Sequence, residues 1–301
     1  MMADPAKPPI LLAIASAGRG PVLEQTLAQI ASLSDQPDAV WLSVAEEEVA
    51  APEALAAEFS ALLTIPLRVL SGPKGLCAQR NAVLDAAPED AIILFLDDDY
   101  LLGDGSVSAL RRLFGTRPDV VMATGRVMAD GILGPGLDHA RGMEMLTPPD
   151  DMGGCAPVYN AYGCNMALRM KTAARHGVRF DTDLPLYGWL EDVDFSRNMA
   201  RYGEILRCDS VFGVHLGTKK GRSRGVPLGY SQLANPIYLI RKGTMSPRRA
   251  LRLMSRNMMA NLLRAPWPEP WVDRVGRLRG NLTALADLAR GRLSPRRILD
   301  L

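Results

Sequence analysis

The sequence is poor in the residues that bind zinc or form disulfide frameworks. It contains four cysteines and three histidines among 301 residues. The cysteines are scattered and form no CxxC pair, which argues against a disulfide framework and against a zinc site. They are Cys77, Cys155, Cys164 and Cys208. We therefore expect four reduced thiols in a cytosolic protein.

The sequence also lacks long apolar segments. No apolar run approaches the ~20 residues that a helix needs to cross a bilayer. The N-terminal residues, MMADPAKPPI, have no basic region followed by an apolar core, so we expect no export signal. Hydrophobic residues make up 48% of the chain, which predicts a sizeable globular core in one large domain or two smaller ones.

Acidic residues are scarce toward the C-terminus. From Lys219 onward there are 18 Lys and Arg against four acids, whereas the first 218 residues hold 17 bases and 29 acids. The formal net charge of +2 thus combines a body near −12 with a tail near +14. This asymmetry predicts a basic surface that meets lipid head groups, nucleic acid or a phosphorylated substrate, unless the charges form a solvated helical face.

Short apolar segments alternate with amphipathic ones through the first 125 residues. Strands are predicted at residues 10–15, 40–44, 67–70, 91–96 and 120–123, and helices at 22–33, 52–63, 75–87 and 106–114. Strands that alternate with helices of this length form βαβ units with right-handed crossovers and a parallel sheet. This half of the chain therefore has the pattern of a nucleotide-binding α/β domain.

The second half of the chain changes in composition. Residues 131–157 are rich in Gly and Pro and are predicted to form a long loop over the sheet. A strand, a helix and one or two further strands are then predicted, at residues 164–169, 190–202 and 204–214. Residues 219–245 are predicted to form a flexible basic loop and a helix.

Two basic amphipathic helices are predicted in residues 246–301. The apolar residues at helical spacing are Leu251, Met254, Met258 and Leu262 in the first, and Val275, Leu278, Leu282 and Leu285 in the second. Trp267 and Trp271 lie in the Pro-rich corner between them. Basic amphipathic helices with terminal Trp are typical of a membrane interface, but such faces also pack on a protein body, and the sequence leaves both alternatives open.

Three acids directly follow the central apolar strand, in the segment AIILFLDDDY at residues 91–100. Because side chains alternate along a strand, Asp97 and Asp99 leave its carboxyl end in one direction and Asp98 in the other. Two carboxylates that close repel each other unless a cation lies between them. Open α/β sheets bind ligands at this edge, so the segment predicts a divalent-metal site, with a solvated acidic turn as the alternative.

Four segments, in this order, resemble motifs of the family 2 glycosyltransferases of GT-A fold. They are GLCAQRN at residues 75–81, Asp97 to Asp99 as a DxD motif, GCNMALR at 163–169, and YGWLEDVD at 187–194. Together they cover roughly residues 10–245. Each motif is weak by itself, but four in the right order and spacing are specific.

The resemblance implies an α/β fold with a Rossmann-like, mostly parallel sheet flanked by helices and followed by a C-terminal helical extension. A catalytic domain would span residues 1–218, with a nucleotide-binding half at about 8–128 and an acceptor half at about 155–218. The implied activity is transfer of a sugar, with inversion, from a nucleotide-diphosphate sugar to a hydroxyl of a saccharide or lipid-linked saccharide. The implied setting is the synthesis of cell-surface polysaccharide, in the cytoplasm or peripherally on the inner face of the plasma membrane.

The resemblance also implies a metal site. Asp99 would ligate a divalent cation that neutralises the departing diphosphate. Asp97 would face the ribose and base, and Asp98 the metal or the donor sugar. His215, which follows a predicted strand, would supply a further ligand, and imidazole together with carboxylates suits Mn²⁺ slightly better than Mg²⁺.

The Glu-Asp-x-Asp segment would provide the general base that inverting transfer requires. The resemblance favours Asp192 as the base, with Glu191 binding the acceptor or holding the loop. Gly163, Asn165 and Trp189 would contact the acceptor or the donor sugar. Without the resemblance, these acids could equally enrich a helix N-terminus, as the helix dipole favours.

Two segments depart from the family pattern. The usual Pro-Thr-Tyr-Asn is replaced by ASAGR at residues 15–19, and the usual Asp-Asp-Gly-Ser by SVAE at residues 43–46. The backbone of Ser16, Ala17 and Val44 could still hold the nucleobase, and Arg80 could reach the base or the phosphate.

Two other classes of function fit parts of the pattern. A metal-dependent phosphohydrolase also begins with a strand ending in DxD, but Leu101 replaces the Thr of that pattern. A non-catalytic protein of the same fold could bind a membrane or nucleic acid, but it would need neither a metal site nor a base. No aromatic-rich basic sheet motif indicates nucleic-acid binding.

Overall fold

The computed structural model describes residues 8–17, 20–47, 52–151, 154–219 and 225–301. Within these ranges, nine strands form one sheet in the order β3-β2-β1-β4-β8-β6-β9-β5, with β7 paired to β9. The strands are β1 (Ile10–Ser16), β2 (Ala39–Ala45), β3 (Leu67–Gly72), β4 (Ile92–Asp97), β5 (Tyr100–Leu102), β6 (Val120–Asp130), β7 (Cys155–Pro157), β8 (Asn165–Arg169) and β9 (Glu204–His215).

Most strands of this sheet run in one direction. The strands β1, β2, β3 and β4 are mutually parallel, β8 runs against β4 and β6, and β6 is parallel to β9. Six of the nine strands therefore share one direction, while β5, β7 and β8 oppose it. The predicted α/β fold with a mostly parallel sheet is confirmed.

Apolar side chains on both faces of the sheet explain why helices cover it on both sides. In β1, Ile10, Leu12 and Ile14 belong to one core cluster, whereas Leu11 and Ala13 belong to the other. Residues of α1 (Gly20–Ala31), α2 (Pro52–Ser60) and α4 (Ser106–Thr116) complete the first cluster. Residues of α3 (Leu76–Ala86), α6 (Met170–His176) and α7 (Glu191–Met199) complete the second.

The segment predicted as a long loop at residues 131–157 contains regular structure. It forms a 3-10 helix at Gly131–Leu133, the helix α5 (His139–Met145) and the strand β7, with residues 152–153 outside the described ranges. The prediction of an unbroken loop is therefore wrong. Two aspartates stabilise the short helices by accepting hydrogen bonds from N–H groups of their first turns. Asp130 accepts a hydrogen bond from the Ile132 N–H, and Asp138 accepts one from the Arg141 N–H at 2.8 Å.

A disulfide joins Cys155 to Cys208. The prediction of four reduced thiols is therefore wrong for this pair. Antiparallel pairing of β7 with β9 places Cys155 directly opposite Cys208, although they lie 53 positions apart in the sequence. Spacing along the chain does not reveal such a register. Cys77 and Cys164 are buried free thiols.

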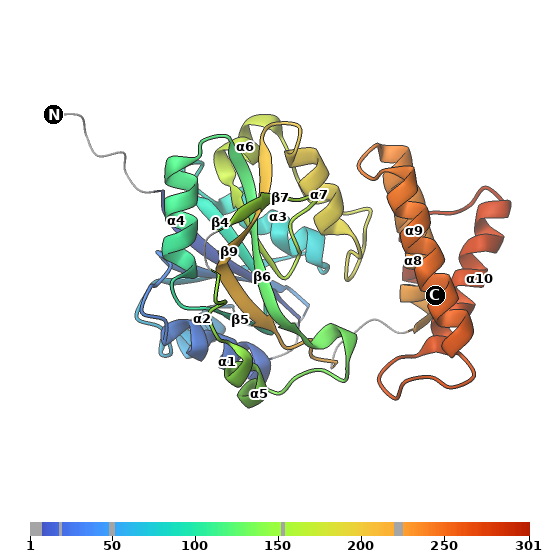
Figure 1. The fold of residues 1–301 in the computed structure, drawn as a ribbon, viewed down its shortest axis with the longest axis horizontal. Helices are drawn as coiled ribbons and strands as arrows, with labels where there is room; N and C mark the ends of the chain where they lie inside the picture. The colour runs from blue at the N-terminus through green and yellow to red at the C-terminus, as the bar shows by residue number, and fades with distance from the viewer. Residues whose placement is uncertain (1–7, 18–19, 48–51, 152–153, 220–224) are drawn as a thin grey trace.

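The C-terminal residues form helices that gather on one side of the sheet domain (Figure 1). They are α8 (Gly225–Lys242), α9 (Pro247–Arg264), α10 (Arg274–Ala289) and a 3-10 helix at Pro295–Asp300. The helices α8 and α10 cross closely, since a Cβ on Gly229 would lie 2.0 Å from the Arg277 carbonyl oxygen. Buried side chains between the helices, including Tyr230 and Ala284, give this region its own small core. The predicted C-terminal helical extension is confirmed.

Contacts of α8 fix the helical extension to the sheet domain. The Asn235 amide donates a hydrogen bond to the Trp189 carbonyl oxygen at 2.7 Å. The buried carboxylate of Asp194 accepts from the Lys242 ammonium at 2.7 Å and from the Thr244 hydroxyl at 2.6 Å. Because Trp189 precedes α7 and Asp194 lies within it, α8 holds the start of α7. In the described ranges, no helix is both long and apolar enough to cross a membrane.

Candidate functional site

Asp97 ends β4, Asp98 and Asp99 form the turn that follows, and the three side chains alternate in direction as expected. Asp97, Asp99 and His215 each turn a ligand atom into one cluster, and these atoms lie within 4.8 Å of one another. Asp98 points elsewhere, because its carboxylate accepts a hydrogen bond from the Ser16 hydroxyl at 2.8 Å. It is fully buried, and the Thr26 hydroxyl donates to its carbonyl oxygen at 2.7 Å. The expected contact of Asp98 with a metal or a donor sugar stays a prediction.

His215 ends β9 and reaches the acids through β5, which pairs with β9 so that Tyr100 lies opposite His215. Its Nε2 atom lies 3.4 Å from Asp99 Oδ1 and 3.7 Å from Asp97 Oδ2. The backbone N–H of Thr218 donates to the other oxygen of Asp99 at 2.7 Å. The cluster therefore unites the ends of β4 and β9 in one acidic site, and Asp97, expected to face the ribose and base, lies inside it.

Asp130 was not predicted as a site residue, and it orients His215. Its Oδ1 atom lies 2.9 Å from His215 Nδ1, and its Oδ2 atom accepts from the Tyr162 hydroxyl at 2.9 Å. Parallel pairing of β6 with β9 places Asp130 beside His215. The sequence prediction ended this strand at residue 123, seven residues short of the acid. A strand continued through residue 130 would have brought Asp130 to the same sheet edge.

The acids around His215 control its charge. Burial opposes protonation most strongly, but the hydrogen bonds to Asp130 and Asp99 outweigh it and raise the pKa of His215 to about 10. Burial likewise opposes ionisation of Asp130, yet the hydrogen bond to His215 lowers the pKa of that carboxyl below its ordinary value. In the absence of a cation, a proton on His215 thus offsets the negative charge of the cluster.

Arg80 joins the metal cluster to the start of α7. Its guanidinium donates to Glu191 Oε1 at 2.6 Å and to the Gly163 carbonyl oxygen at 2.8 Å, and lies 3.4 Å from Asp97 Oδ1. The side chain lies over the rings of Phe95 and Phe180 and the residue is only 1% exposed. The expected contact of Arg80 with a base or phosphate stays a prediction.

Glu191 and Asp192 begin α7 on the side of the site. Burial raises the pKa of Glu191 to about 8 although Arg80 pulls it down, and Glu191 Oε2 is buried without a hydrogen-bond partner. Asp192 is half-buried and accepts from the Gly163 N–H at 3.1 Å and from the Val193 N–H at 2.8 Å. Burial raises the pKa of Asp192 above its ordinary value, and these N–H donors and Arg80 partly offset that rise.

The backbone before α7 is strained. Leu186 and Leu190 have positive φ angles of 57° and 73°, and Gly188 between them has 62°. For a leucine this left-handed conformation costs about 1–3 kcal/mol, and such strain is typical of functional sites. A Cβ on Gly188 would lie 3.0 Å from Cys77 Sγ and 3.2 Å from Glu191 Cγ, so the turn packs tightly on the helix that carries the acids.

The residues predicted to contact sugar differ in their burial and in the protein groups that already bind them. Gly163 bridges Arg80 and Asp192 through its carbonyl oxygen and N–H. Asn165 is buried, and its amide is bonded to Tyr100, Thr124 and the backbone of Gly125. Trp189 is half-buried and receives the Asn235 hydrogen bond. Contacts of these three residues with sugar stay predictions.

The predicted nucleobase residues lie at neighbouring strand ends. Ser16 of β1 pairs with Val44 of β2, which is buried, while Ala17 beyond them is exposed. Gln79 was not predicted here, and its amide donates to the carbonyl oxygens of Ser16 and Ser43 at 2.9 and 3.0 Å. Gln79 therefore fixes the spacing of the two strand ends. Their contact with a base stays a prediction.

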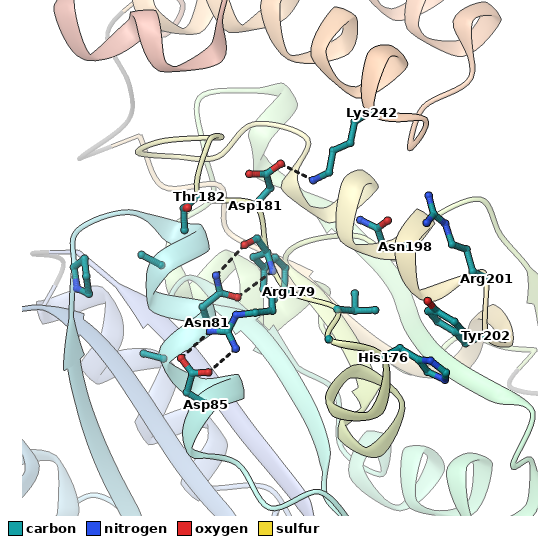
Figure 2. Close-up of a pocket in the computed structure, with 16 residues that line it drawn as sticks. Asn81, Asp85, His176, Arg179, Asp181, Thr182, Asn198, Arg201, Tyr202 and Lys242 are labelled. Carbon is teal, nitrogen blue, oxygen red and sulfur yellow. Dashed lines mark hydrogen bonds and ion pairs between the residues drawn. The ribbon is translucent and has the colours of Figure 1, made fainter.

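An open pocket of about 760 Å³ lies beside α3, and none of the predicted site residues lines it (Figure 2). Asn81 points into it and exchanges hydrogen bonds of 2.8 and 3.0 Å with the backbone of Phe180. Asp85 pairs there with Arg179, and Lys242 with Asp181. Two acids and two bases of this pocket are therefore taken up in ion pairs with each other, and the acidic cluster at the strand ends remains the stronger candidate site.

Comparison with known proteins gives a likeness at the level of fold. No family model and no curated protein matches the sequence. The mannosyltransferase PcManGT from Pyrobaculum calidifontis, solved in complex with GDP-Man and Mn²⁺, superposes with a TM-score of 0.53 at 16% identity, over 95% of this chain and 77% of that one. Residues 1–349 of TarS from S. aureus, in complex with UDP, give a TM-score of 0.53 at 11% identity, over 95% and 83%.

A further structure of TarS 1–349, in complex with UDP-GlcNAc, gives a TM-score of 0.52 at 11% identity, over 86% of this chain and 73% of that one. At identities this low, the three likenesses show a shared fold. They agree with the predicted architecture.

Proposed function

We propose that this protein is an inverting glycosyltransferase that takes its sugar from a nucleotide-diphosphate donor. The observation that carries the proposal is the union of two features at one sheet edge. Asp97, Asp99 and His215 form a cluster that fits a cation, and Asp192 lies nearby on α7, connected to Asp97 through Arg80 and Gly163. The nucleotide sugars GDP-Man and UDP-GlcNAc, bound by proteins of the same fold, support this class of donor.

The donor set of the cluster fits a divalent cation. Two carboxylates and an imidazole lie within 4.8 Å of one another, and the Nδ1 side of His215 is held by Asp130 so that Nε2 faces the acids. Carboxylates suit Mg²⁺ and Mn²⁺, and the imidazole favours Mn²⁺, the ion present in PcManGT. When bound, such a cation would supply positive charge to the diphosphate leaving group.

Asp192 is the general base of the proposed reaction. Its carboxylate would accept the proton of the acceptor hydroxyl while that oxygen attacks the anomeric carbon from the face opposite the leaving diphosphate. Its raised pKa makes it a stronger base than an ordinary aspartate. Glu191 and Arg80 position this group, because their ion pair fixes the first turn of α7 beneath the Gly163 backbone.

We assign roles to the remaining predicted residues from their places in the fold. Ser16, Ala17 and Val44 would hold the base of the donor at the strand ends, with Asp97 and Asp98 nearby. Gly163, Asn165 and Trp189 would shape the sugar-binding surface.

We propose that the chain is divided into a catalytic domain at residues 1–218, a connecting loop and helix at 219–245 and a helical tail at 246–301.

The proposed acceptor is a saccharide or a lipid-linked saccharide, in the synthesis of cell-surface polysaccharide at the cytoplasmic face of the plasma membrane. The Cys155–Cys208 disulfide weighs against a reducing compartment. Alkylation of free thiols at the moment of cell lysis tests whether Cys155 and Cys208 are reduced or joined in the cell. Two labelled thiols at these positions support the cytoplasmic assignment, and protected thiols contradict it.

Thermal melting in the presence of nucleotide diphosphates tests the proposed function. A donor that binds only the folded protein raises its melting temperature by mass action. We expect stabilisation by one nucleoside diphosphate that requires Mn²⁺ or Mg²⁺ and disappears with chelator. Stabilisation that persists in excess chelator would contradict the metal site. Release of inorganic phosphate from simple phosphate esters, without sugar transfer, would instead identify a phosphohydrolase.

A further inference from the structure

Exposed apolar side chains concentrate in the helical tail. Twelve of the eighteen large hydrophobic residues that are exposed in the described ranges lie between residues 251 and 301. This segment makes up about a sixth of the chain. Large exposed apolar areas on a folded protein usually mark a surface that contacts another body.

The exposed apolar residues lie on the outer sides of α9 and α10. On α9, Leu251 and Leu262 are 62% and 54% exposed, whereas Ala250 and Asn261, which precede them and point about 100° away around the helix, are buried. On α10, Leu282 is 58% exposed. The small residues of α10, including Gly276, Gly280 and Ala284, are buried on its other side. We call the outward-facing set the tail face: Leu251, Met259, Leu262, Leu263, Trp267, Trp271, Val275, Leu282 and Leu285.

Packing of the tail on the body therefore leaves the tail face open. Of the apolar residues predicted on α9, Met254 and Met258 pack inward, but Leu251 and Leu262 do not. The corner between α9 and α10 carries Trp267, which is 84% exposed.

The tail that carries this face is rich in arginine. Residues 246–301 contain twelve arginines, no lysine and four acids, a net charge of +8. Arg252 and Arg256 are exposed on α9 among its outward leucines. The four acids all have protein partners. Glu269 pairs with Arg264 and Arg274. Asp273 caps α10, Asp287 accepts from the Tyr230 hydroxyl and Asp300 pairs with Arg297. The outward charge is therefore positive.

We propose that the tail face binds the surface of an anionic lipid bilayer. Leucine and tryptophan gain free energy by entering the boundary between head groups and acyl chains, while arginine pairs with lipid phosphates at the same depth. A second copy of the chain fits less well, because a two-fold contact through this face would bring two strongly positive surfaces together. Nucleic acid would engage the arginines but leave the leucines in water.

The helix α8 connects the tail helices to the candidate site. Asn235 and Lys242 tie α8 to the start of α7, so the tail face is held in a fixed relation to Asp192. Under the proposed function, binding of the tail face would bring the protein to the surface in which a lipid-linked acceptor lies. The lipid binding itself does not depend on catalysis, and its test uses no nucleotide sugar.

Sedimentation of the full chain with vesicles tests the proposal. We expect binding to vesicles that contain phosphatidylglycerol, none to vesicles of phosphatidylcholine alone, and weaker binding as salt screens the charges. Equal binding to both vesicles, or to neither, would overturn the proposal.

Two pairs of substitutions separate the apolar and basic contributions. Leu262→Asp with Leu282→Asp should abolish vesicle binding, whereas Leu133→Asp, at an exposed leucine of the sheet domain, should not change it. Arg252→Glu with Arg256→Glu should weaken binding at least tenfold, because each arginine near an anionic surface contributes about fivefold. The matched control is Arg112→Glu on the exposed side of α4. Unchanged melting temperatures would show that the variants fold.

Fluorescence locates the contact. Brominated lipids should quench the emission of the full chain, and Trp267→Phe should remove much of that quenching. If the leucine variants keep their vesicle binding, the tail face is not the contact. If they instead convert a dimer into a monomer in analytical ultracentrifugation and no vesicle binding is found, the face joins two copies of the chain and the proposal is wrong.

Discussion

The strand-end site and the helical tail differ in which side chains they bury. The site buries charged groups, and the tail exposes apolar ones. At the site, acidic groups are withdrawn from water and held by one another, as in the chain of contacts from Tyr162 through Asp130 and His215 to Asp99. In the tail, apolar and cationic side chains such as Leu282 face outward. Both arrangements are unfavourable for an isolated protein, because buried charge and exposed leucine each cost free energy.

The difference indicates what each region lacks. Two carboxylates and an imidazole converge at the site, and under the proposed function a divalent cation would bind there together with a diphosphate. The tail lacks an apolar and anionic covering, which a bilayer would supply. If this division holds, substitutions at the site should impair transfer and leave vesicle binding intact, and substitutions on the tail face should do the reverse.

The largest effect is expected from Asp99→Ala. Loss of this carboxylate should abolish transfer and remove metal-dependent binding of nucleotide, because Asp99 is a proposed ligand of the cation. Vesicle binding should be unchanged. Chelator should reproduce the loss in the unsubstituted protein, and Asp104→Ala, at an exposed acid beyond β5, is the matched control. Full transfer by the Asp99 variant would contradict the metal hypothesis.

A loss of at least ~10² in kcat is expected from Asp192→Asn, since the amide keeps the shape but cannot accept a proton. Donor affinity should change little. Glu191→Gln should cost less, because Glu191 positions the helix and does not touch the acceptor proton. Single-turnover assays with both variants rank them, and the reverse order would transfer the role of base to Glu191.

A loss of about 10–100-fold in Mn²⁺ affinity is expected from Asp130→Asn, the usual effect of removing a group that orients a ligating histidine. Titration of the free protein with Mn²⁺, followed by electron paramagnetic resonance, measures this without substrate. Asp138→Asn changes a similar helix cap at α5 and should leave the affinity unchanged. Equal effects of the two variants would indicate a merely structural role for Asp130.

A smaller effect is expected from pH. Only the ionised form of Asp192 accepts a proton, and burial raises its pKa, so kcat/KM should begin to fall at a higher pH than for an ordinary aspartate, whose pKa is about 3.9. Below the raised pKa the rate should drop about tenfold per pH unit. A pH profile with its acid limb at the ordinary value would exclude Asp192 as the titrating base, as would an unchanged limb in Asp192→Asn.

The sequence was informative where a strand runs directly into the site. Side-chain alternation predicted correctly that Asp97 and Asp99 would turn one way and Asp98 the other, although β4 itself ends at Asp97. The same reasoning missed Asp130, because Gly125 and the exposed Arg126 interrupt the apolar run at an irregularity in the pairing, and β6 continues beyond them only half-buried. Local patterns detect a strand by its buried part, and here the functional residue lies beyond it.

The errors at the cysteines and in residues 131–157 have a different cause. Pairing of β7 with β9 brings Cys155 to Cys208, and this register depends on the whole sheet. The exposure of Leu282 could not be predicted from the sequence either, because helical periodicity identifies an apolar face without indicating what covers it. The sequence left the two alternatives for the tail open for this reason.

The hydrogen bond from Asn235 to the Trp189 carbonyl and the ion pair of Lys242 with Asp194 have a thermodynamic consequence. They connect α8, on which the tail helices pack, to α7 and the strained turn before it, so binding at the tail face can bias the conformation of the site and the reverse. Any such coupling is reciprocal: a bilayer that tightens donor binding by some factor must itself be bound more tightly, by the same factor, once the donor is in place. The protein would then stay longest on a membrane when it is loaded with sugar.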